Sequence, residues 1–69
     1  MDKVNYDAFK SAFDRELKKH NLVETFDENE YAHIYEAFVT DMEVGLHFDI
    51  AMNCALYYNT SLGGKLYEL

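Results

Sequence analysis

The sequence predicts an all-α protein, a small bundle of three helices that forms a single helical domain over residues 1–69. Three observations predict this fold. Apolar residues recur at three- and four-residue spacing in three segments, no segment of useful length alternates apolar and polar residues, and proline is absent. The chain is also too short to build more than one hydrophobic core. A core of this size supplies only about 3–5 kcal/mol without a further stabilising device.

The first helix is expected at about residues 5–20. Asn5 is a typical N-cap, and Asn21 can adopt the left-handed conformation that ends many helices. Between these two residues the apolar side chains recur at helical spacing and share one stripe: Tyr6, Phe9, Phe13 and Leu17.

The second helix is expected at about residues 27–44. Asp27 and Glu30 have the spacing of a capping box, although Thr25 with Glu28 is an alternative start. Gly45 is the natural end of this helix. The residues between form one apolar face: Tyr31, Ile34, Tyr35, Phe38 and Met42.

The third helix, expected at about residues 46–60 and followed by Gly63 and Gly64, is apolar around most of its circumference. Such a helix must be covered on several sides, and two amphipathic helices of one small chain leave it partly open. Another copy or a partner would complete its open side, and the sequence predicts self-association, with a homodimer formed through the third helix by Phe48, Met52, Tyr57 and Tyr58. The tail at residues 65–69 either docks as an extended segment or frays.

No motif in the chain predicts catalysis, a cofactor or a metal. Glu30 and His33 have the Glu-x-x-His spacing of di-iron bundles, but such a centre needs a second pair and two more glutamates. Cys54 lies in an apolar segment without a nearby positive charge, so it is expected to act as a small hydrophobic residue. We therefore expect that the protein is not an enzyme.

The net charge is strongly negative, with 13 acidic against 6 basic residues and a formal value of −7. Binding to nucleic acid or to an anionic membrane is disfavoured, because basic side chains drive both. No stretch is long and apolar enough for a membrane span, and residues 1–5 lack the apolar region of a secretory signal. With its single cysteine, the chain is expected to be cytoplasmic.

The acidic residues are also unevenly distributed, since residues 23–64 contain eight of them and no lysine or arginine. Uncompensated charge of this kind destabilises a small fold unless it faces a basic partner. The partner-binding residues are expected to be Glu28, Glu30, Glu36, Asp41, Glu43 and Asp49.

These observations predict a small acidic protein that acts by protein–protein contact. Its most specific form is an inhibitor or regulator that covers a basic, nucleic-acid-binding surface of a larger protein. Small anionic proteins of phages and other mobile elements block restriction and CRISPR enzymes in this way, some by imitating the charge of DNA. The analogy is one of size and charge, and no motif carries it. The alternative is a homodimeric structural or regulatory subunit whose acidity only confers solubility.

Overall fold

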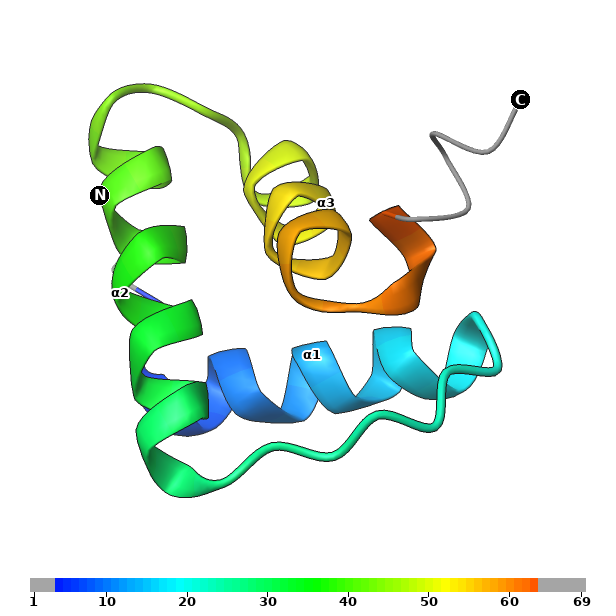
Figure 1. Ribbon diagram of the computed structural model, residues 1–69. Helices are drawn as coiled ribbons and strands as arrows, with labels where there is room; N and C mark the ends of the chain where they lie inside the picture. The colour runs from blue at the N-terminus through cyan, green and yellow to red at the C-terminus, as the bar shows by residue number, and fades with distance from the viewer. Residues whose placement is uncertain (1–3, 64–69) are drawn as a thin grey trace.

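The structure is a computed structural model that describes residues 4–63, and it confirms the all-α fold. The helices are α1 (Tyr6–Lys19), α2 (Glu28–Glu43) and α3 (Phe48–Asn59), and residues 4–63 contain no strand. Figure 1 shows α2 standing across the N-terminal end of α1, with α3 in the angle between them. The connection after α1 runs back along that helix, so α2 starts beside its first turns. Both remaining helices pack against α2, α3 most extensively.

The N-termini of α1 and α2 are capped by their own side chains, as the sequence predicts. The Asn5 carboxamide oxygen accepts a hydrogen bond from the Ala8 N–H at 2.7 Å. Asp27 accepts from the Glu30 N–H at 2.8 Å, and the Glu30 carboxylate accepts from the Asp27 N–H at 3.0 Å. This reciprocal pair is a complete capping box, so α2 starts after Asp27 and not after the alternative cap, Thr25.

The C-termini of α1 and α2 end in the same backbone motif. Asn21 (φ 57°) and Gly45 (φ 106°) have positive φ, and each is followed by a leucine whose N–H turns back into the helix. Leu22 donates to the Leu17 carbonyl at 2.8 Å, and Leu46 donates to the Asp41 carbonyl at 3.1 Å. This is the hydrogen bonding of a Schellman motif, which turns both leucines back against the core.

The third helix is shorter than the expected 46–60, because it spans Phe48–Asn59. Its start was misplaced because Leu46 belongs to the motif that ends α2, which leaves His47 as the N-cap. At the other end, Thr60 has an extended backbone and stops the helix before the glycines are reached.

Beyond α3, residues 61–63 make a further helical turn. The Ser61 N–H donates to the Glu24 carboxylate at 3.1 Å, which ties this turn to the connection between α1 and α2. A Cβ added to Gly63 would collide with the Tyr57 carbonyl, so a glycine is required at this position. The expectation for the tail, residues 65–69, lies outside the described residues.

The core lies where the three helices meet. Phe9, Phe13 and Phe38 are completely or almost completely buried, as is Leu56 of α3. The Phe9 and Phe38 ring centroids are 4.8 Å apart, and those of Phe9 and Phe13 are 5.5 Å apart. The remaining buried residues are Leu17, Tyr31, Ile34, Ala51, Met52 and Ala55.

We expect Phe38→Ala to unfold the protein. Removing a buried phenylalanine costs about 3–5 kcal/mol, which equals the stability that a core of this size supplies. Val23→Ala is the control, since Val23 is 90% exposed and its loss changes stability by less than about 0.5 kcal/mol. Far-UV circular dichroism in urea measures both variants. A Phe38→Ala protein that unfolds at the same urea concentration as the parent would contradict this core.

Candidate functional site

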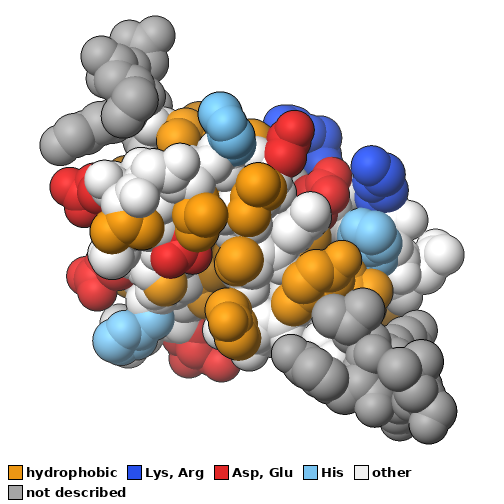
Figure 2. Space-filling model, turned by 90° about the horizontal axis from the view of Figure 1, so that it is seen from above, with side chains coloured by type: hydrophobic (Ala, Val, Ile, Leu, Met, Phe, Trp, Pro, Cys, Tyr) orange, Lys and Arg blue, Asp and Glu red, His pale blue; other side chains and the backbone are white. Residues whose placement is uncertain are grey.

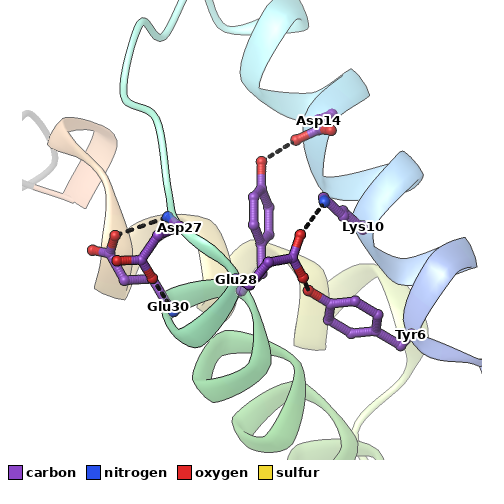
Figure 3. A network of polar contacts seen from close by, with 7 residues as sticks. Tyr6, Lys10, Asp14, Asp27, Glu28 and Glu30 are labelled. Atoms are coloured by element: carbon purple, nitrogen blue, oxygen red, sulfur yellow. Dashed lines mark hydrogen bonds and ion pairs between the residues drawn. The ribbon is translucent and has the colours of Figure 1, made fainter.

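Glu28, one of the predicted partner-binding residues, is engaged within the chain. Its carboxylate accepts a hydrogen bond from the Lys10 ammonium and another from the Tyr6 hydroxyl, both at 2.9 Å (Figure 3). These two hydrogen bonds hold the pKa of Glu28 below its usual range. The same contact raises the pKa of Lys10. Glu28 therefore ties the first turn of α2 to α1.

A second polar contact joins the same two helices. The Tyr31 hydroxyl donates to Asp14 at 2.6 Å, and the Lys10 ammonium lies 4.8 Å from the centre of the Tyr31 ring. Burial, with the hydrogen bond to Asp14, raises the pKa of Tyr31 to about 12. Nearby, the Tyr35 hydroxyl donates to the Val4 carbonyl at 2.9 Å.

The other predicted acidic residues point to different parts of the surface. Glu30 closes the capping box, although its side chain remains exposed. Glu36 and Glu43 are seven residues apart and lie on the same outer side of α2, where both are exposed. Asp41 is half-buried beside α3, and Asp49 is exposed at the start of α3. The structure thus separates these residues instead of gathering them on one face.

Two acidic positions differ in their charge environment. Asp49 lines an open hollow of about 390 Å³ between α1 and α3, which Arg15 and Lys19 also line. Asp41 lines the junction of α2 and α3, where no lysine or arginine is present. Among residues 4–63, neither Asp41, Glu36 nor Glu43 forms an ion pair. These three carboxylates are therefore available to an external cation.

The outer side of α3 carries an apolar stripe, defined here as Ile50, Cys54, Tyr57 and Tyr58. Ile50, Cys54 and Tyr58 repeat at four-residue spacing and lie one above the other, and Tyr57 flanks them. Tyr58 is 84% exposed, Ile50 is 47% exposed and Tyr57 is 39% exposed. Cys54 is half-buried and reduced. Within the described residues, α3 is therefore covered on its core side and open on this one.

Two of the four predicted self-association residues, Tyr57 and Tyr58, lie in this stripe. Phe48 is exposed at the start of the helix, where its ring packs edge-on against Phe38 with centroids 5.6 Å apart. Met52 is only 3% exposed and packs in the core. The buried position of Met52 removes it from any outer contact surface.

A groove of about 250 Å³ lies between α2 and α3, along the edge of the stripe. Cys54 and Tyr58 line it from α3, and His33, Ala37 and Asp41 line it from α2. Core side chains reach into it from below. Figure 2 shows hydrophobic side chains gathered in the middle of the face seen from above, with acidic side chains at several points around them and Lys, Arg and His side chains at others. The groove itself is apolar, with Asp41 and His33 among its lining residues.

Neither a cluster of metal ligands nor a membrane-spanning helix is found among the described residues. Within residues 4–63, no group of three or more His, Cys, Asp or Glu side chains could hold a metal ion. No helix in that part of the chain is long and apolar enough to cross a membrane. Comparison of the chain with protein-family models, curated proteins and solved structures gives no match. The groove between α2 and α3 and the carboxylates near it are therefore the basis for the proposed function.

The groove is the feature that sequence reasoning missed. Its walls come from two helices, and the small residues that leave space for it, Ala37 and Ala55, carry no motif. One signal was available, because Ile50, Cys54 and Tyr58 repeat at four-residue spacing on the side of α3 opposite the buried Met52. A second apolar stripe on one helix indicates a second contact surface.

We expect the Glu28 contacts to make stability depend on acid pH. Because the pKa of Glu28 is lowered on folding, its stabilisation is complete above its ordinary pKa of 4.5 and is lost as pH falls through the lower folded value. Urea unfolding at pH 7 and pH 3 should show a smaller loss of stability for Glu28→Gln than for the parent. Glu36→Gln is the control and should retain the parent's loss. Equal losses in the parent and Glu28→Gln would contradict this role.

We expect Tyr31 to ionise late in an alkaline titration, because burial and the hydrogen bond to Asp14 raise its pKa. Its raised pKa means that its contribution to stability is complete below pH 10 and is lost as pH rises toward about 12. Ultraviolet absorbance of tyrosinate against pH should show a late fraction that Tyr31→Phe removes. Tyr58→Phe is the control and should keep this fraction. A Tyr31→Phe curve with the late fraction intact would show that the Asp14 hydrogen bond does not form.

Proposed function

We propose that the protein acts by binding another protein, as an inhibitor or regulator that covers a basic, nucleic-acid-binding surface. The observation that carries the proposal is the apolar groove and stripe on the outer side of α3, beside carboxylates that have no cation partner among residues 4–63. Apolar and aromatic side chains supply most of the binding energy in protein interfaces. Surrounding charges raise the association rate and select partners of opposite sign.

The predicted acidic residues do not suit this role equally. Glu28 already pairs with Lys10 and accepts a hydrogen bond from Tyr6 within the chain. Glu36 and Glu43 are exposed on the outer side of α2, and Asp41 lies at the groove. In the proposal these three residues take the leading electrostatic role, with Glu30 and Asp49 contributing at longer range.

The alternative function is a homodimeric structural or regulatory subunit, and the exposed tyrosines of α3 fit it as well. Tyr57 and Tyr58 are exposed on α3, and tyrosine is enriched in interfaces between identical and different proteins alike. In this alternative a second copy covers the stripe, and the acidity serves solubility only. Sedimentation equilibrium at micromolar concentration separates the two, because a homodimer gives twice the monomer mass.

The electrostatic part of the proposal can be tested on the partner recovered from host cells by affinity capture. We expect the double variant Glu36→Lys/Glu43→Lys to associate about tenfold more slowly at low salt and to lose most of its salt dependence. The matched variant Glu36→Gln/Glu43→Gln should fall between this variant and the parent, and circular dichroism should show unchanged helix content in both.

The same partner tests whether the covered surface binds nucleic acid. We expect the parent chain to displace a fluorescent DNA duplex from it in an anisotropy titration, because both would occupy one basic surface. Two results would contradict the proposal: an association rate that the charge reversal leaves unchanged, or a partner that binds the DNA and the chain together.

A further inference from the structure

We propose that the groove between α2 and α3 receives an apolar side chain from a basic amphipathic helix of the partner, and that Asp41 pairs with a lysine or arginine beside that side chain. The inference rests on the proposed function and deepens it, because it names the anchoring site and the chemistry that fits there. It concerns the groove residues, whereas the association rate depends mainly on the outer carboxylates, Glu36 and Glu43.

The size and lining of the groove favour a side chain over a small-molecule ligand. Its volume of about 250 Å³ is below the 300–1,000 Å³ typical of pockets for drug-sized ligands. Its base is apolar, formed by Ile34, Phe38 and Ala55, all of which are buried. Ala37 and Ala55 lie on facing helices, and their short side chains leave room for a larger one to enter. An aliphatic side chain from outside would remove this apolar surface from water.

The shape of the adjoining stripe favours a helical partner segment. The stripe extends from Ile50 to Tyr58, which is about 12 Å along the axis of α3. A partner helix laid beside it would present apolar residues at three- and four-residue spacing over about two turns. Tyr58, at 84% exposure, has the largest exposed surface to bury and is the expected main contact of this interface.

The charges near the groove indicate that the residues flanking the apolar side chains of the partner helix are basic. Residues 23–63 contain no lysine or arginine, and the Asp41 carboxylate at the groove forms no ion pair within the described chain. An acidic partner would place like charges together, whereas a basic one would supply the missing cation beside Asp41. His33, at the same groove, would add a positive charge only when protonated.

Charge complementarity also disfavours a second copy of the chain as the occupant of the groove. In a two-fold symmetric dimer each copy uses the same surface, so the groove of one copy would meet α2 and α3 of the other. Residues 23–63 of that second copy would bring no lysine or arginine to Asp41. A different protein with basic residues would cover the apolar stripe and also supply a cation to Asp41.

The experiment uses the full chain and a synthetic probe, a 14-residue amphipathic helical peptide made of leucine and lysine. Two control peptides keep its length, one with glutamate in place of lysine and one with serine in place of leucine. Backbone amide chemical shifts of the isotope-labelled protein are followed during titration with each peptide. We expect the leucine–lysine peptide to shift amides of residues 33–41 and 50–58, and each control to bind at least about tenfold more weakly.

Variants of the groove test the assignment in the same titration. Ala37→Met fills the groove from an exposed position and should weaken probe binding about tenfold or more, and Asp41→Asn about threefold or more. Ala32→Met is the matched control, because Ala32 is exposed on the opposite side of α2, and it should bind within about twofold of the parent. Circular dichroism of each variant establishes that the helices are retained.

Several outcomes would overturn the inference. These are equal binding of the leucine–glutamate peptide, amide shifts confined to α1, an Ala37→Met variant that binds like the parent, or no binding of the probe at millimolar concentration. A parent chain that sediments as a dimer and becomes monomeric on Tyr58→Ser would assign the stripe to a second copy.

Binding measurements with the recovered partner distinguish an error in the groove assignment from an error in the proposed function. If Glu36→Lys/Glu43→Lys slows association and Ala37→Met leaves affinity unchanged, the electrostatic function stands and the groove is not its anchor. If Ala37→Met weakens affinity and the charge reversal changes nothing, the groove binds a partner and the electrostatic function is wrong.

Discussion

The packing of Phe9 against Phe38 is the contact on which the rest of the structure depends. It joins α1 to α2 with ring centroids 4.8 Å apart, and Phe38 in turn packs against Phe48 at the start of α3. A chain of this length buries only about 60% of the surface it exposes when unfolded, so a few large side chains must supply most of its stability. The described residues place all five phenylalanines of the sequence in one aromatic network, together with Tyr6, Tyr31 and Tyr35.

That network also explains which aromatic side chains remain on the surface. Tyr6 and Tyr31 keep their rings against the core and direct their hydroxyls to carboxylates of the facing helix. Tyr57 and Tyr58, by contrast, take no part in the network and lie on the outer side of α3. The acidic residues divide in a similar way, since Glu28 secures α2 to α1 while Asp41 faces the groove. Under the proposed function, the tyrosines and carboxylates that stabilise the fold therefore differ from those that would contact a partner.

The helix caps and turns could be predicted from the sequence, because they depend on interactions between residues close together in the chain. The capping box of Asp27 and Glu30, and the turn at Asn21, depend on residues within a few positions of each other. α3 starts two residues after the approximate start expected, because Leu46 closes the preceding helix, a use that the apolar pattern does not reveal. Met52 was placed on the outer surface because a helix that is apolar almost all round gives no sign of which side faces the core. The groove depends on how α2 and α3 approach each other, which no short segment encodes.

We propose that the uncovered side of α3, with the groove beside it, is the surface by which the protein binds a partner. Amide hydrogen exchange of the chain, free and bound to the partner captured from host cells, tests this most directly. On binding, we expect the amides of residues 33–41 and 50–58 to exchange more slowly. We expect little change in α1, whose exposed side carries Arg15, Lys18 and Lys19. Protection confined to α1, with residues 50–58 exchanging as in the free chain, would contradict it.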